Sequence, residues 1–248
     1  METLILIAVL GFTIGSFLGL CITRLSRGES IVFPPSHCDA CGRRLGVGEL
    51  IPLLGFILCR GRCPSCGTKV PWWYPGIEVL TAGLYIVLYL QNGPNLVTVK
   101  YIDLVSLLLV MSGIDLITYT IPDVLILIGI GLGLIFLPFG DISWQAALIG
   151  GFLGGGLPLL LAIVSRGGMG GGDVKLGFVL GLFLGWKQVL LALFLSALLG
   201  ALFGLLLMTL GRKGLRDAIP FGPFMALGTI ITVLWGEGII EWYINLFF

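Results

Sequence analysis

Long apolar runs separated by short polar segments make up most of this chain. A helix needs about 20 mostly apolar residues to cross a lipid bilayer, and eight stretches approach or reach that length. The stretches lack the period-two alternation of membrane-spanning strands. The pattern therefore predicts an all-α, polytopic membrane protein with about eight transmembrane helices. The predicted spans are 3–25, 76–92, 97–117, 122–139, 144–165, 173–186, 187–210 and 219–245.

A polar region interrupts this pattern between the first and second spans. It covers residues 26–75 and predicts one extramembrane module inserted into a membrane domain. The first run begins with Glu2 instead of a basic segment and ends without a small-residue cleavage pattern, so we expect a retained span. The predicted organisation is a first transmembrane helix at 1–25, a module at 26–75 and a transmembrane core at 76–248.

Composition and charge support the membrane assignment and predict its orientation. The 248 residues are 57% hydrophobic and 11% charged, whereas a soluble domain has about 25% charged residues. The formal net charge of +1 gives no electrostatic reason to expect nucleic-acid binding. Half of the 14 basic residues lie between Arg24 and Lys69. Because basic loops stay in the cytoplasm, the module and the connections at 118–121, 166–172 and 211–218 are predicted to be cytoplasmic, with both termini outside.

The polar module carries two CxxC pairs, Cys38-x-x-Cys41 and Cys63-x-x-Cys66, with 21 residues between them. Four thiolates in this pattern can enclose a zinc ion tetrahedrally. Such a site is structural, because four cysteines leave no open position for water. The alternative is a set of reduced or redox-active cysteines without a metal. The sequence predicts a small zinc-ribbon-like loop.

Two carboxylates at the ends of apolar runs are the candidate catalytic residues. Asp115 ends the third span and Asp173 opens the sixth. A charge at bilayer depth costs about 2.5–3.5 kcal/mol on insertion scales, so such residues are functional candidates. Both are predicted near the cytoplasmic face, where two neighbouring carboxylates would share a proton and act as general base and general acid. The alternative is helix capping, since Asp173 occupies an N-terminal position.

Five further residues are candidates for supporting this site. The glycines before Asp173 allow close approach of a backbone. A lysine two residues later either pairs with Asp173 or extends its amine to the interface. Asp123 follows a proline and is a cap or turn residue. Glu78, in the second span, is either a polar contact or part of the site. These candidates are Gly170, Gly172, Lys175, Asp123 and Glu78.

Taken in order, the motifs resemble those of the bacterial type IV prepilin peptidases, also called leader peptidase/N-methyltransferases, a family of GxGD intramembrane aspartic proteases. The matching segments are GSFLGLCITRL from Gly15, SHCDAC from Ser36, IPL from Ile51, RGRCPSC from Arg60, Tyr74-Pro75 with Glu78, Asp115 through Pro122-Asp123, and GGGD ending at Asp173. The resemblance implies Asp115 and Asp173 as the catalytic pair, and Cys38, Cys41, Cys63 and Cys66 as zinc-type ligands. One position departs from the family, since Gly19 replaces the usual Asn after GSFL.

The resemblance implies an enzyme of the bacterial inner membrane with its active site toward the cytoplasm. It would remove the basic leader of type IV prepilins or type II secretion pseudopilins, whose apolar N-terminal helix lies in lipid. It would then methylate the new N-terminus with S-adenosylmethionine as donor. The sequence locates no site for this donor, since no glycine-rich strand–loop–helix pattern occurs.

Three alternatives remain at this point. The Asp pair also suits a proton- or ion-coupled transporter. The cysteine module also suits an assembly protein without enzymatic activity. The departure at Gly19 leaves open a peptidase that lacks methyltransferase activity.

Overall fold

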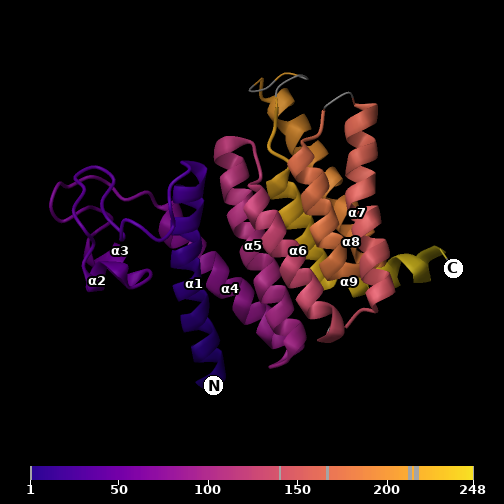
Figure 1. The fold of residues 1–248 in the computed structure, drawn as a ribbon, viewed down its shortest axis with the longest axis horizontal. Coiled ribbons are helices and arrows are strands. Elements are labelled where there is room, and N and C mark those ends of the chain that lie inside the picture. Colours follow the sequence, from indigo (N-terminus) through magenta and orange to yellow (C-terminus); the bar gives the residue numbers. More distant parts are fainter. Residues whose placement is uncertain (1, 140, 166–167, 212–213, 215–217, 248) are drawn as a thin grey trace. The chain divides into compact units, whose positions relative to one another are not determined.

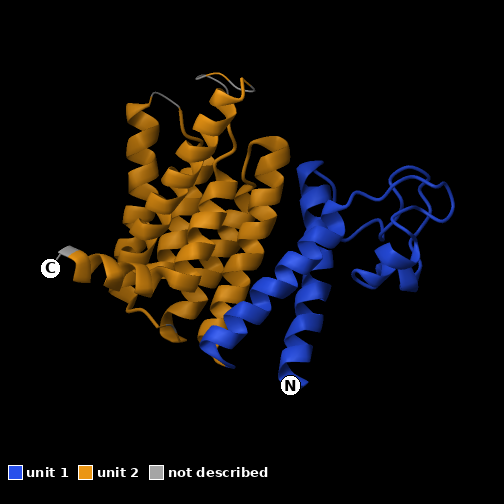
Figure 2. Ribbon diagram, turned by 180° about the vertical axis from the view of Figure 1, so that it is seen from behind, with its two compact units in different colours: residues 1–94 blue, residues 95–248 orange. Residues whose placement is uncertain are grey.

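A computed structural model describes residues 2–139, 141–165, 168–211, 214 and 218–247 (Figure 1). Helices are the regular structure of this part of the chain, and its only β-type pairings are isolated bridges, His37 with Arg44 and Arg62 with Lys69. The predicted all-α class is therefore confirmed. The chain divides into two compact units, Met1–Pro94 and Asn95–Phe248 (Figure 2).

The first unit pairs two long helices, α1 (Glu2–Ser26) and α4 (Trp73–Asn92), and carries the cysteine module between them in sequence. Glycines of α1 allow the two helices to approach closely. A Cβ atom at Gly11 would lie 2.6 Å from the Ala82 Cα, and one at Gly15 would lie 2.7 Å from the Glu78 Cα. The module adds two short helices, α2 (Val47–Leu50) and α3 (Leu54–Leu58). The predicted second span thus packs against the first.

The second unit is a helical bundle. Its elements are α5 (Leu96–Thr118), α6 (Asp123–Phe136) with the 3₁₀ turn η1 (Leu137–Phe139), α7 (Trp144–Val164), α8 (Gly171–Thr209) and α9 (Gly222–Phe247). The glycine-rich face of α7 packs against α8, where a Cβ atom at Gly150 would lie 2.6 Å from the Gly181 carbonyl oxygen. Small residues therefore bring these backbones together.

Helix α8 is two helical segments that fold back at Gly185. This residue has φ 73° and ψ 174°, values that glycine adopts readily and other residues do not. A Cβ atom at Gly154 would lie 2.2 Å from the Gly177 carbonyl oxygen and 3.0 Å from Val189 Cγ2. Both segments therefore flank α7, and Figure 1 shows the two ends of α8 at the same end of this unit.

The number of eight spans is not confirmed. Six helices in the described residues are long and apolar enough to cross a membrane: α1, α4, α5, α7, α8 and α9. The predicted span at 122–139 corresponds to a shorter apolar helix, Asp123–Phe139. The predicted spans 173–186 and 187–210 are the two segments of α8, which counts as one helix among the six. Parts of the connections 166–172 and 211–218 lie outside the described residues.

Candidate active site and metal centre

Asp115 lies one turn before the end of α5. Its carbonyl oxygen accepts the N–H of Tyr119, a left-handed residue (φ 57°) that ends the helix. The side chain is 4% exposed, and its Oδ2 accepts the backbone N–H of Gly222 at 2.9 Å. The first N–H groups of a helix have no partner within it. The start of α9 thus supplies a donor that holds the Asp115 carboxylate in place.

Asp173 lies in the first turn of α8 and is 8% exposed. Its Oδ2 accepts the backbone N–H of Gly170 at 3.3 Å, as a carboxylate of a capping box does. Asp173 therefore does contribute to capping the N-terminus of α8, as the alternative predicted. This capping does not exclude catalysis, because the Asp173 and Asp115 carboxylates are also near enough to interact electrostatically.

The connection between α5 and α6 lies against the start of α8. A Cβ atom at Gly172 would lie 3.1 Å from the Ile121 Cβ. The Lys175 amine forms an ion pair with Asp123 Oδ1 at 2.6 Å, and not with Asp173. Both partners of this pair are largely exposed, with 51% and 69% of their side chains accessible. Of the two roles predicted for Lys175, the structure therefore does not show the pairing with Asp173, and its amine lies in an exposed ion pair instead.

The geometry suits proton transfer by two carboxylates. Asp115 and Asp173 come from different helices, are buried, and each accept one backbone N–H. Nearby carboxylates resist simultaneous ionisation, so one tends to keep a proton while the other is a base. The described residues show no His, Lys or Arg paired with either side chain.

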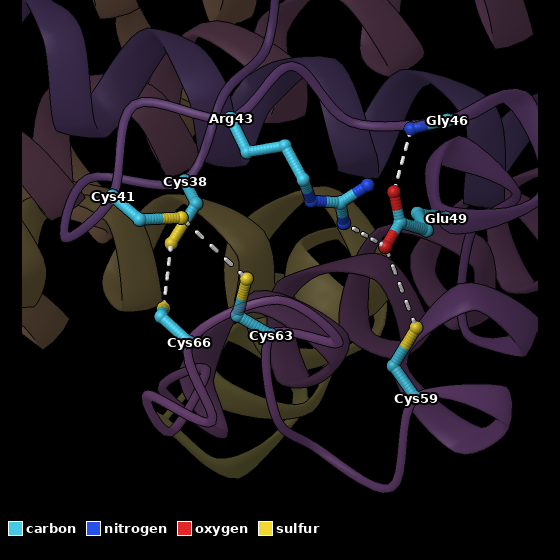
Figure 3. A network of polar contacts seen from close by, with 8 residues as sticks. All are labelled: Cys38, Cys41, Arg43, Gly46, Glu49, Cys59, Cys63 and Cys66. Carbon is cyan, nitrogen blue, oxygen red and sulfur yellow. Dashed lines mark hydrogen bonds and ion pairs between the residues drawn. The ribbon is translucent and has the colours of Figure 1, made fainter.

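The four predicted cysteine ligands converge in the module. Their sulfur atoms all lie within 4.8 Å of one another (Figure 3). The Cys38 and Cys66 sulfurs are 3.8 Å apart, and those of Cys41 and Cys63 are 3.9 Å apart. Tetrahedral zinc with Zn–S bonds of about 2.3 Å separates its sulfurs by about 3.8 Å. The cluster therefore has the size of a metal site.

The backbone forms a tight turn at each CxxC pair, closed by the glycine that follows the second cysteine. Gly42 and Gly67 have φ values of 70° and 72°, which favour glycine. Their N–H groups donate to the carbonyl oxygens of Cys38 and Cys63 at 2.8 and 2.9 Å. Backbone N–H groups of Cys66 and Ser65 donate to the Cys63 sulfur and lower the pKa of that thiol to about 6. The second pair thus favours a thiolate, the form that binds metal.

Glu49 joins three parts of the module beside the cysteine cluster (Figure 3). It accepts the Gly46 N–H at 2.6 Å and the Arg43 guanidinium at 2.5 Å, and Cys59 Sγ lies 3.8 Å from it. The Gly46 N–H and then Arg43 lower the pKa of the Glu49 carboxyl. Sequence reasoning missed this network because only tertiary contacts relate Arg43 and Glu49 to the cluster.

Glu78 is buried on α4, with 7% of its surface exposed. Its Oε2 accepts the backbone N–H of Leu53, just before α3, at 2.7 Å. Of the two predicted roles, the structure shows a polar contact, between α4 and the module within the first unit.

Together, the bundle and its buried carboxylates define a class, the polytopic membrane proteins with an internal aspartate pair. Comparisons of the sequence make the assignment specific. Residues 9–92 match the family model for the bacterial peptidase A24 N-terminal domain, and residues 102–205 match that of the type IV leader peptidase family. The chain belongs to the type IV leader peptidase family.

Several relatives named prepilin leader peptidase/N-methyltransferase match over most of their length. The Bacillus subtilis protein is 35% identical over 246 residues, covering 96% of both chains. The Pseudomonas putida protein is 35% identical over 90% of this chain and 79% of the relative. The Pseudomonas aeruginosa protein is 32% identical over 96% of this chain and 92% of the relative. No solved structure gives a significant match.

Proposed function

We propose that this protein is a membrane-embedded aspartic endopeptidase that removes the leader of type IV prepilins or pseudopilins and then methylates the new N-terminus. The observation that carries the peptidase is the convergence of two buried carboxylates, Asp115 from α5 and Asp173 from α8. Membership of the leader peptidase family supports the substrate class.

In the proposed mechanism the ionised carboxylate takes a proton from water, and the protonated carboxylate donates a hydrogen bond to the scissile carbonyl. Water adds to the carbonyl carbon, and the resulting diol collapses as the C–N bond breaks and a proton passes to the leaving amine. Each aspartate accepts one backbone N–H, from Gly222 or Gly170. Neither is assigned a fixed role, because a coupled pair titrates as a unit.

The substrate's apolar helix would enter the bundle from lipid, which places its leader junction at the end of the bundle that holds Asp115 and Asp173. The basic module and the positive-inside rule favour the cytoplasmic side of the inner membrane for this end. Gly170 places no side chain against the Asp173 carboxylate, where a Cβ atom would lie 3.3 Å from Oδ2. A substrate backbone can therefore lie close to the dyad.

Two bound groups belong to this proposal. A structural zinc ion, held by Cys38, Cys41, Cys63 and Cys66, would fix the module, and the sulfur separations fit it. S-adenosylmethionine, when bound, would supply the methyl group for the new N-terminal amine. The relatives' name supports this second activity.

Mass spectrometry of a prepilin incubated with the purified protein tests the proposal. Wild type should remove the leader, and addition of S-adenosylmethionine should add one methyl group. Asp115→Asn and Asp173→Asn should each reduce cleavage by about 10²–10⁴-fold or more. Asp103→Asn, on the same helix as Asp115, is the matched control and should cleave normally. Cleavage by both dyad variants at the wild-type rate would refute the mechanism, and ion flux in liposomes would then test a transporter.

A further inference from the structure

The first unit contains a cavity of about 550 Å³ beside the metal centre. Residues of α1, the cysteine module and α4 line it, all within residues 16–78. Sites for small molecules generally measure about 300–1,000 Å³ and combine apolar walls with a few polar groups. This cavity fits that description, with Phe56 and Tyr74 among its aromatic lining residues and Cys38 and Cys63 in its wall.

Two buried groups of opposite charge line the cavity. Arg24 is 6% exposed and donates one hydrogen bond, from Nη1 to the Ser30 carbonyl oxygen at 3.0 Å. Glu78 is 7% exposed and accepts the Leu53 N–H. Within the described residues, neither one belongs to an ion pair. Buried charges in proteins are normally paired, so this arrangement favours a ligand that brings both a negative and a positive group.

We propose that this cavity is the binding site for the methyl donor S-adenosylmethionine. The inference rests on the methyltransferase activity proposed above and gives it a location. The donor carries a carboxylate, two cationic centres, a ribose diol and an adenine. Arg24 is the partner for the carboxylate, and Glu78 is an acceptor for the cationic or hydroxyl donors. Tyr74 and Phe56 offer aromatic surface to the adenine.

The same placement gives the metal centre a role in binding. The cysteine cluster forms part of the cavity wall through Cys38 and Cys63. A module of this size has too small a core to hold its shape unaided. Removal of the metal should therefore weaken donor binding.

Calorimetric titration of the full-length protein in lipid nanodiscs with S-adenosylhomocysteine tests the site directly. Arg24→Gln and Glu78→Gln should each weaken binding by about tenfold or more. Arg44→Gln and Glu237→Gln remove exposed charges outside the cavity lining and should bind as wild type does. Chelation of the metal should also weaken binding. Normal affinity in both cavity variants would overturn the proposal.

A measurement on the wild type covers the case in which a variant fails to fold. Ultraviolet cross-linking with S-adenosylmethionine labelled in its methyl group, followed by peptide mapping, should label residues 16–78. Label confined to residues 95–248 would overturn the site while leaving the methyltransferase activity intact. A wild type that neither binds the probe nor methylates a cleaved substrate would overturn the activity and the site together.

Discussion

The backbone N–H of Gly222 donates a hydrogen bond of 2.9 Å to the Asp115 carboxylate, so the first residue of α9 holds a side chain of α5. A Cβ atom at residue 222 would lie 2.8 Å from Asp115 Oδ2 and 3.2 Å from its Cβ and Cγ. Any side chain there must displace the carboxylate. Glycine is therefore required at this position for the geometry of the candidate dyad.

We expect Gly222→Ala to slow leader removal by about 10- to 100-fold, because small misplacements of catalytic groups are costly. The initial rate of leader removal, measured by mass spectrometry, checks this. Gly238→Ala is the matched control, since it lies on the same helix and a Cβ atom there meets nothing within 4 Å. Equal rates for the Gly222→Ala variant and wild type would show that Gly222 does not position the dyad.

The fold-back of α8 predicts a stability effect at Gly185. A Cβ atom there makes only ordinary contacts, the nearest at 3.6 Å, so the cost of Gly185→Ala comes from the backbone angles alone. Residues in such conformations cost about 1–3 kcal/mol. Unfolding in detergent should show this loss, whereas Gly156→Ala, in open space on α7, should be neutral or slightly stabilising. An unchanged unfolding free energy for Gly185→Ala would contradict the fold-back geometry.

The hydrophobic pattern was sufficient to predict the all-α class and the positions of the long apolar helices, although it did not predict the number of spans, because length and composition report on burial in lipid. The doubled CxxC spacing and the rarity of acidic residues likewise led to the cysteine cluster and to Asp115 and Asp173. Each of these signals is local in sequence. They needed no knowledge of which helices pack together.

What the sequence did not reveal depends on contacts between distant segments. Gly222 and Asp115 are 107 residues apart, and Lys175 and Asp123 are 52 apart. The turn in α8 was placed at Trp186–Lys187, but the non-helical residue is Gly185. With 39 glycines in the chain, most of them in or beside apolar runs, one glycine is a weak marker of a turn.

The metal centre predicts a dependence on pH with a definite sign. The Cys63 thiol has a pKa lowered to about 6 by the N–H groups of Cys66 and Ser65, so it is a thiolate at pH 7 and becomes protonated below about pH 6. Protons then compete with the metal. Bound zinc, measured with a chromophoric chelator, should be retained at pH 7.5 and released progressively as the solution is made acidic.

Substitution of single cysteines distinguishes the four predicted metal ligands from Cys59, a thiol of the same module outside the cluster. Cys63→Ser should abolish tight zinc binding at pH 7.5. Cys59→Ser changes a cysteine of the same module that lies outside the cluster, beside Glu49, and should keep one zinc per chain. Wild-type zinc content in the Cys63→Ser variant would mean that the four-cysteine set is not the site.

The ion pair of Lys100 with Asp141, near the start of α5, is where we expect a substitution to lower the free energy of unfolding most. Lys100 is 3% exposed, forms an ion pair with Asp141, and donates to the Phe183 carbonyl oxygen at 3.0 Å, just before the turn in α8. Asp141 is 34% exposed and also accepts the Tyr101 hydroxyl at 3.0 Å.

Because Lys100 is the more buried partner, removing its counter-charge should cost more than removing the lysine itself. We expect Asp141→Asn to destabilise by about 3–5 kcal/mol and Lys100→Met by less, since water can reach Asp141. The double variant should lose less than the sum of the two, as coupled partners do. Unfolding of all four proteins in one detergent measures the cycle. Strictly additive losses would show that the ion pair contributes nothing. Leader removal should persist in the folded Lys100→Met variant, because residue 100 lies about 22 Å along α5 from Asp115.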